Sequence, residues 1–429
     1  MQRLYRSVAA RTHSGAQDTI RAAWRLLGAG SFLIALLLYF SPQIQAQVSH
    51  EDPDWVTTWS GSPSTLPPDA PAGSGYQNQT VRLIVHTSAG GRAVRLRLSN
   101  THGEKPLVVG SVTVARQASG AEIVPDSVRQ VSFSSRQSIT IPRWATVISD
   151  PIEMDIPPTA NLAVSLYLPE ETGFITTHAL SNQTNYLSSE GNHVNSPALP
   201  VASETTGWPF LTAIDVLPEQ PVRTIVTLGD SITDGWDSTE SANQRWPNHF
   251  AQRLYQNSGI ENFAVANAGI SGNRVTTEQN PTFGQNLQAR FQRDVLALSN
   301  VSHIILLEGI NDIGMSARSA QPIEADQIID GYRQIIARAH ARGIKVIGAT
   351  LLPYEGAAYY TEAGNQVRVE VNHFIRSSGE FDGVIEFDKA VQDPANPNRI
   401  RPDFTADNLH PNDAGYRAMA EIINLALFD

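Results

Sequence analysis

Four short segments in the second half of the chain contain the residue types that acyl transfer by a serine requires. The segments are residues 229–231 (Gly-Asp-Ser), 267–272 (Asn-Ala-Gly-Ile-Ser-Gly), 309–312 (Gly-Ile-Asn-Asp) and 407–411 (Asp-Asn-Leu-His-Pro). Acyl transfer needs a hydroxyl nucleophile, a base that takes its proton, a group that orients the base, and hydrogen-bond donors for the oxyanion. Each segment supplies one of these parts, so together they predict a serine esterase.

Ser231 and His410 are the candidate nucleophile and base. Ser231 follows an apolar run at 224–228, and open α/β sheets place their sites at such strand ends; alternatively, Ser231 or Asp230 only caps the next helix. Asp407 lies three residues before His410. Over a turn this separation brings the carboxylate to the imidazole Nδ1 and leaves Nε2 free for the serine proton. We interpret the other histidines of this half, which lack such a partner, as structural or surface groups: His249, His303, His340 and His373.

Gly272 and Asn311 are the candidate oxyanion donors. A glycine at position 272 lets a backbone N–H approach a ligand without a Cβ in the way, although turn geometry alone would also explain it, and Gly269 is the competing candidate. The Asn311 amide is a neutral donor, and its alternative role is helix capping. We expect Asp312 and Glu308 to hold the loop rather than to take part in catalysis.

In this order, the four segments resemble the SGNH, or GDSL, hydrolase family, over roughly residues 223–429. The resemblance implies that Ser231 is the nucleophile, that His410 is the base and that Asp407 orients it. It also implies an oxyanion hole made of the N–H groups of Ser231 and Gly272 and the side chain of Asn311. The fold it implies is flavodoxin-like, with strand order 2-1-3-4-5.

Two positions depart from the common family pattern. Ile232 stands where Leu is frequent, and Ile310 replaces a second glycine before the asparagine. Both replacements are apolar, so the chemistry should not change. The sequences of residues 308–312 (Glu-Gly-Ile-Asn-Asp) and 55–59 (Trp-Val-Thr-Thr-Trp) resemble those of a subfamily of exported esterases encoded near xylan-degrading enzymes. This resemblance implies carbohydrate esters as substrates.

The first half of the chain has the pattern of an antiparallel β-structure. Between residues 55 and 217, short runs of alternating apolar residues are separated by Gly, Pro, Asn and Ser. This pattern predicts a β-sandwich of the jelly-roll type. A polar stretch at 188–206 precedes the last expected strand, 210–217.

Beyond residue 219, apolar runs alternate with helical patterns, which predicts a parallel sheet with crossover helices in a three-layer α/β fold. The expected strands are residues 224–228, 263–265, 303–307, 345–351 and 384–387. Helical spacing links three sets of apolar residues: Trp246, Phe250 and Leu254; Ile328, Tyr332, Ile335 and Ile336; and Tyr416, Met419, Ile423 and Leu427. We therefore expect a signal peptide (1–46), a β-sandwich accessory domain (47–218) and an SGNH hydrolase catalytic domain (219–429).

The N-terminus has the order of a secretory signal peptide. Five arginines and one aspartate precede a mainly apolar run at 26–40, and a plausible cleavage site ends at Ala46. Cleavage would give a secreted or periplasmic protein, while an uncleaved membrane anchor is the alternative. The whole chain carries a formal charge of −11, and removal of the basic leader would make it more acidic.

Composition narrows the possible partners. An acidic chain without clustered Lys and Arg argues against nucleic acid and anionic membranes as partners after cleavage. The 429 residues include no cysteine, so disulfides and thiolate metal sites are excluded. No metal-binding or dinucleotide motif occurs, and we expect no metal and no cofactor. The oligomeric state is left open.

The four segments predict hydrolysis of acyl esters, and the family resemblance implies short acyl groups, above all acetyl, on a plant-type polysaccharide or oligosaccharide. One alternative is a lipase-like or aryl esterase that acts on longer or aromatic acyl groups. Another is a carbohydrate-binding protein on an inactive esterase scaffold. In the accessory region, loops that form one wall of the active-site cleft are one alternative. Core packing and sugar stacking are the alternative roles of its aromatic residues: Trp55, Trp59, Tyr76, Trp144 and Trp208.

Overall fold

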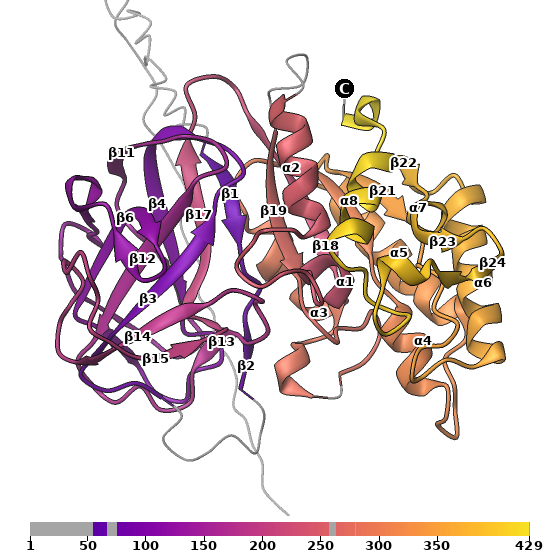
Figure 1. Ribbon diagram of the computed structural model, residues 1–429, viewed down its shortest axis with the longest axis horizontal. Coiled ribbons are helices and arrows are strands. Elements are labelled where there is room, and N and C mark those ends of the chain that lie inside the picture. The colour runs from indigo at the N-terminus through magenta and orange to yellow at the C-terminus, as the bar shows by residue number, and fades with distance from the viewer. Residues whose placement is uncertain (1–54, 67–74, 257–262, 279, 429) are drawn as a thin grey trace, which may run out of the picture. The chain divides into compact units, whose positions relative to one another are not determined.

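The computed structural model describes residues 55–66, 75–256, 263–278 and 280–428 (Figure 1). They belong to a single compact unit, Glu51–Asp429. The expected signal peptide lies outside the described residues. Within the described ranges, no helix has the length and apolar character needed to cross a membrane. The expected boundary near residue 219 falls between two strands and stays a prediction.

A parallel five-stranded sheet forms the centre of the second half. Its strands, in spatial order, are β19 (Phe263–Gly269), β18 (Arg223–Gly229), β20 (Val301–Leu307), β21 (Lys345–Ala349) and β22 (Gly383–Ile385). In chain order this is 2-1-3-4-5, the order that the family resemblance implies. The chain leaves β18 in one direction for β19 and then returns across the sheet, so β18 lies at a topological switch point, where such folds place their sites.

Helices cover both faces of the parallel sheet, because right-handed crossovers in opposite directions pass on opposite faces. The helices are α1 (Ser231–Asp234), α2 (Trp246–Gln256), α3 (Leu287–Phe291), α4 (Ile310–Ser316), α5 (Ala325–His340), α6 (Glu362–Ser377), α7 (Phe387–Val391) and α8 (Asp413–Ile422). Helix α2 packs against α8 and β19, whereas α5 packs against α3, α6 and β21. This arrangement is the expected three-layer α/β domain.

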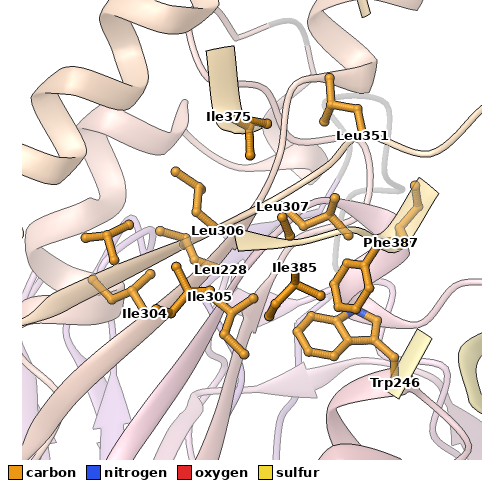
Figure 2. Close-up of a cluster of buried hydrophobic side chains, with 14 of the residues drawn as sticks. Leu228, Trp246, Ile304, Ile305, Leu306, Leu307, Leu351, Ile375, Ile385 and Phe387 are labelled. Carbon is orange, nitrogen blue, oxygen red and sulfur yellow. The ribbon is translucent and has the colours of Figure 1, made fainter. Parts of the chain in front are cut away.

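The core of this domain consists of strand side chains from the sheet interior and rings from the helices (Figure 2). Ile304 and Ile305 of β20 point to opposite faces, and both are fully buried. On one side, the rings of Trp246 and Phe387 meet edge to face with centroids 5.1 Å apart. The near-continuous apolar runs that predicted these strands are therefore explained by burial on both faces.

The N-terminal region is antiparallel, as its alternating pattern predicted. One sheet contains β1 (Val56–Ser60), β17 (Leu211–Leu217), β4 (Gly91–Ser99), β10 (Thr146–Ile148) and β11 (Ile152–Ile156). A second contains β15 (Val201–Thr205), β14 (Asn185–Glu190), β3 (Gln79–His86), β12 (Asn161–Leu168), β6 (Ser111–Ser119), β7 (Glu122–Ile123) and β8 (Arg129–Gln130). Smaller sheets pair β16 (Trp208–Pro209), β13 (Thr176–His178) and β2 (Ser64–Thr65), β5 (Leu107–Val109) with β9 (Ile139–Ile141), and β23 (Gln392–Asp393) with β24 (Asn396–Ile400). The jelly-roll topology stays a prediction.

Most aromatic residues of the N-terminal region belong to its core. Trp55, Trp59 and Trp208 are buried, and the rings of Trp59 and Trp208 meet at 83° with centroids 4.9 Å apart. Tyr76 is partly buried and packs against the same core. Trp144 is 70% exposed. Among the candidate aromatics, core packing is thus the main role, with Trp144 as the exception.

Side chains of the N-terminal region cover the edge strand β19 of the parallel sheet. The Ser88 hydroxyl donates to the Val265 carbonyl and accepts from the Val265 N–H, both at 2.9 Å. The Ser60 hydroxyl donates to the Asn267 carbonyl at 2.7 Å. An uncovered edge would expose unpaired backbone groups, so these contacts protect the strand that leads to the second candidate segment.

Several predicted elements have different bounds in the structure: β19 extends to Gly269, and β21 ends at Ala349. The polar stretch 188–206 contains strand β15, whose pairing with β14 does not need an apolar face. Phe387, expected at the end of a strand, begins helix α7. The last helix ends at Ile422, and Leu427 follows in a separate 3₁₀ turn.

Candidate active site

Ser231 is the first residue of α1, two residues after β18 ends at Gly229. Asp230 caps this helix, because its Oδ1 accepts a hydrogen bond from the Ile232 N–H at 3.0 Å. The capping role considered for this segment therefore belongs to Asp230. Ser231 points its hydroxyl at His410 instead, and its own N–H lies in the first turn, where backbone donors lack intrahelical acceptors.

The structure brings Ser231, His410 and Asp407 into one line of contacts. Ser231 Oγ is 2.8 Å from His410 Nε2, and His410 Nδ1 is 2.7 Å from Asp407 Oδ2. The other carboxylate oxygen, Oδ1, accepts the backbone N–H groups of Leu409 and His410 at 2.9 and 2.8 Å. With Nδ1–H donated to the carboxylate, Nε2 presents its lone pair to the serine hydroxyl.

The Asp407 carboxylate is held in its ionised form. Partial burial alone would raise the pKa of Asp407, but the hydrogen bonds that it accepts from His410 outweigh burial and hold this pKa well below its usual range. Asn412, two residues after His410, caps α8 by accepting from the N–H groups of Ala414 and Gly415. The turn before α8 therefore fixes Nδ1 of His410 against Asp407, while Nε2 faces Ser231.

Gly272 and Gly269 have different structural reasons to be glycine. Gly272 has φ +79°, and a Cβ there would lie 2.4 Å from the ring of Phe283. Gly269 ends β19, where a Cβ would lie 2.4 Å from the backbone nitrogen of Asp234. Gly269 is thus needed for close packing of β19 on α1, whereas the backbone of Gly272 lies in the loop beyond the strand.

Asn311 lies on the first turn of α4, next to the loop that contains Gly272. Its side-chain NH₂ donates to the Asn273 carbonyl at 3.1 Å, and its Oδ1 accepts from the Tyr359 hydroxyl at 3.3 Å. Asp312 accepts two backbone N–H groups of Val275 and Thr276 at 2.8 and 3.0 Å. Asp312 therefore holds the loop after β19, as expected.

Arg290, which was not among the residues selected from the sequence, connects the three strand ends below the site. Its guanidinium donates to the Gly229 and Ala268 carbonyls at 3.0 and 2.7 Å and to Asn273 Oδ1 at 2.8 Å. It also lies 3.5 Å from the Glu308 carboxyl group. Burial raises the pKa of Glu308 well above its usual range, although Arg290 opposes this shift. Glu308 is thus a buried group next to Arg290. Glu308 was expected to hold the loop, but its carboxyl group faces Arg290 instead.

His410 is not the only histidine with a carboxylate partner, so that part of the sequence interpretation is wrong. His340 Nε2 lies 2.7 Å from Asp382 Oδ2 on the surface, and the buried His178 Nε2 lies 2.9 Å from Asp234 Oδ1. Both partners are distant in sequence, and for that reason spacing did not reveal them. His410 differs from these two because its second nitrogen contacts a serine hydroxyl.

The register of the sheet explains why the candidate residues meet at one place. Gly229 pairs with Gly269 on one side and with Leu307 on the other. Three strands therefore end at one level, and the segments that follow them meet there. Residues 227–418, which include all four segments, match the model of the GDSL-like lipase/acylhydrolase family. This region is a GDSL-like lipase/acylhydrolase domain.

The GDSL-like domain confirms the family resemblance and makes the protein a carboxylic ester hydrolase. Solved structures similar to this chain include a GDSL-like lipase from Bacteroides thetaiotaomicron (22% identity, 49% of this chain and 91% of the other, TM-score 0.36). Others are an acetyl xylan esterase (22%, 46% and 96%, TM-score 0.37) and a carbohydrate acetylesterase from Sinorhizobium meliloti (17%, 46% and 94%, TM-score 0.36). A comparison with curated proteins gave no match.

Proposed function

We propose that the protein is a secreted serine esterase that removes short acyl groups, acetyl above all, from a plant-type polysaccharide or oligosaccharide. The observation that carries this proposal is the chain of contacts Ser231 Oγ–His410 Nε2–Asp407, at 2.8 and 2.7 Å. These distances fit direct proton transfer from the hydroxyl to the imidazole. Export is inferred from the basic and apolar leader alone.

In the proposed mechanism, His410 takes the Ser231 proton while Oγ attacks the ester carbonyl carbon. The resulting imidazolium is stabilised by the ionised Asp407. The tetrahedral intermediate collapses when its C–O bond to the alcohol breaks, and the leaving alkoxide takes the proton from His410. Water, deprotonated by His410, then attacks the acyl-enzyme, and the carboxylic acid and the free serine are released.

The proposed oxyanion hole consists of the N–H groups of Ser231 and Gly272 and the Asn311 amide. An NH₂ group has two hydrogens. One of those of Asn311 is used by the Asn273 carbonyl, which fixes the orientation of the amide. The second hydrogen is available for the developing negative charge, where a preorganised donor is most effective.

Two aromatic rings beside these donors support a small acyl group. Phe283 packs against Gly272 so closely that a Cβ would not fit. The Tyr359 ring lies against Gly314, where a Cβ would be 2.3 Å from it, and its hydroxyl contacts Asn311. Rings in these positions limit the room next to the proposed oxyanion hole, which favours acetyl over longer acyl chains.

Trp236 supports a carbohydrate as the alcohol part of the ester. Its ring is 45% exposed, with its centroid 6.2 Å from that of His410. Its backbone is fixed, because its N–H donates to the Ser231 carbonyl at 2.9 Å and its carbonyl accepts from the Tyr416 hydroxyl at 2.6 Å. An exposed ring on this fixed backbone, beside the base, offers a flat apolar surface to a sugar ring.

Trp236→Ala is therefore expected to raise KM for an acetylated xylo-oligosaccharide about tenfold, the loss of about 1.4 kcal/mol of ring contact. KM for ethyl acetate should not change, because its alcohol is too small to reach the ring. The measurement is acetate release at varied concentrations of the two esters.

Trp144→Ala is the matched control, since Trp144 is also exposed but belongs to the N-terminal strand region. It should leave both KM values unchanged. An unaltered KM for the oligosaccharide in Trp236→Ala would remove Trp236 from the sugar site. Faster hydrolysis of octanoyl or aryl esters than of acetyl esters by the unaltered protein would contradict the proposed acyl group.

A further inference from the structure

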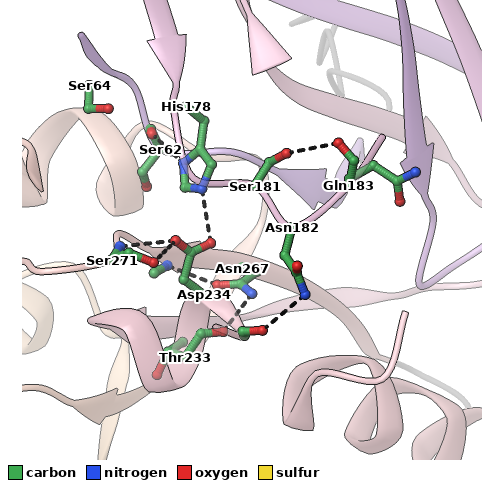
Figure 3. Close-up of polar contacts among 12 residues, drawn as sticks. Ser62, Ser64, His178, Ser181, Asn182, Gln183, Thr233, Asp234, Asn267 and Ser271 are labelled. Atoms are coloured by element: carbon green, nitrogen blue, oxygen red, sulfur yellow. Dashed lines mark hydrogen bonds and ion pairs between the residues drawn. The ribbon is translucent and has the colours of Figure 1, made fainter. Parts of the chain in front are cut away.

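His178, the last residue of β13, connects the N-terminal strands to the helix that begins with Ser231 (Figure 3). The residue is only 3% exposed. Its Nδ1 lies 2.8 Å from the Ser62 carbonyl oxygen, and its Nε2 lies 2.9 Å from Asp234 Oδ1. Asp234 is the last residue of α1. The imidazole is therefore fixed at both nitrogens, with one partner in each half of the chain.

The two partners require a doubly protonated ring. A carbonyl oxygen and a carboxylate oxygen only accept hydrogen bonds, so both ring nitrogens of His178 must donate. Burial lowers the pKa of His178, but the charge and hydrogen bond of Asp234 and the bond to Ser62 outweigh burial and raise this pKa overall. Arg245 opposes the rise, while its Nε donates to the Asp234 carbonyl at 2.9 Å. His178 and Asp234 thus form a buried ion pair.

Asp234 passes this contact on to the loop that contains Gly272. Its second oxygen, Oδ2, accepts from the Ser271 N–H at 2.9 Å and from the Ser271 hydroxyl at 2.7 Å. Its own backbone N–H donates to the Asp230 carbonyl at 2.8 Å. A single carboxylate therefore joins the helix of the proposed nucleophile to the residue directly before Gly272.

The loop that follows β13, which contains Ser181 and Asn182, also contacts the segment after α1. The Asn182 side chain donates to the Ser238 carbonyl at 2.7 Å, in the segment that follows α1. Arg245 in turn donates to the Ser181 carbonyl at 2.6 Å. The loop after β13 is thus attached to both ends of the segment that follows the nucleophile.

We propose that His178 is a positioning residue for the oxyanion hole: it holds Asp234 so that Asp234 fixes Ser271 and, through it, the N–H of Gly272. The proposal rests on the proposed function, in which that N–H binds the oxyanion. It gives the N-terminal strands a part in catalysis that does not require them to bind carbohydrate. Such strands complete the active site instead of forming a separable binding module.

Loss of this contact should act on the transition state more than on substrate binding. A donor displaced by about 1 Å costs up to about 10²-fold in rate. We therefore expect His178→Ala to lower kcat between about 10-fold and 10²-fold and to change KM less than about threefold. The rate should be expressed per active site titrated with an organophosphonate, so that misfolded protein does not enter kcat.

A double variant keeps the test valid if His178→Ala does not fold. His178→Ala leaves the buried Asp234 charge without its partner, which is strongly unfavourable; adding Asp234→Asn removes this charge but does not restore the connection to β13. The double variant should therefore fold and keep a low kcat. Asp234→Asn alone should lower kcat less than the double variant does, because an amide can donate to a neutral His178 and still accept from Ser271.

His303→Ala is the matched control, as it removes a buried imidazole near the amino-terminal end of β20, at the opposite end of the strands from the site. Its kcat per titrated site should stay within about twofold of the unaltered protein. If Ser231→Ala is inactive but the double variant has an unaltered kcat, the positioning role is wrong and the esterase proposal stands. If Ser231→Ala keeps its activity, the proposed function itself fails.

Discussion

Ser231→Ala is expected to lower kcat for ester hydrolysis about 10⁶-fold, because without the hydroxyl His410 has no nucleophile to activate. The fold should not change. Helix α1 is capped by Asp230 and not by Ser231, so the melting temperature should stay within about 2 °C of the unaltered protein. The measurement is acetate release by purified protein, together with a thermal melt.

Ser302→Ala is the matched control for this substitution. Ser302 lies near the amino-terminal end of β20, at the opposite end of the strands from the site, and its hydroxyl contacts His303 Nδ1 at 2.9 Å. Its kcat should stay within about twofold of the unaltered value. If Ser231→Ala retained more than about 1% of the rate, a serine mechanism at this position would be excluded.

Asn311→Ala is expected to lower kcat between about 10²-fold and 10³-fold, the usual effect of removing one oxyanion donor. KM should change little, since the ground-state carbonyl depends less on this donor than the oxyanion does. The substitution also breaks the contact with the Asn273 carbonyl, so some loss of stability should accompany it. Steady-state kinetics with a soluble acetyl ester measure both constants.

A second buried asparagine separates the catalytic effect from the structural one. Asn372 on α6 is 2% exposed and bonds the backbone of Leu351 through both side-chain atoms. Asn372→Ala should therefore lower the melting temperature without an effect on kcat. Equal losses of kcat in the two variants would show that Asn311 acts only through stability.

The sequence predicted the parts of the fold that depend on local pattern. The apolar runs that became β18, β19 and β20 are buried on both faces and therefore stand out in composition. Asp407 and His410 are three residues apart in a turn, so their contact could be inferred from spacing alone. The helix α6 was not selected, because its polar residues Asn365, Arg368 and Asn372 are buried and disturb the apolar period.

Contacts between distant segments could not be predicted in this way. His178 and Asp234 are 56 positions apart and belong to differently patterned halves of the chain. Arg290 is fully buried and donates hydrogen bonds to carbonyl oxygens of two strands. Nothing in the sequence of its own short helix indicates these contacts. In both cases the partners are defined only once the strands are assembled, and a single sequence does not contain that information in local form.

The most direct test of the central claim, that Ser231 is the nucleophile, is mass spectrometry of the full-length protein after reaction with an organophosphonate. The reagent bonds covalently to an activated serine and expels its leaving group. The account predicts one adduct per chain, on the tryptic peptide 224–245 that contains Ser231, and no adduct in Ser231→Ala. An adduct on another residue, or equal labelling of Ser231→Ala, would contradict it.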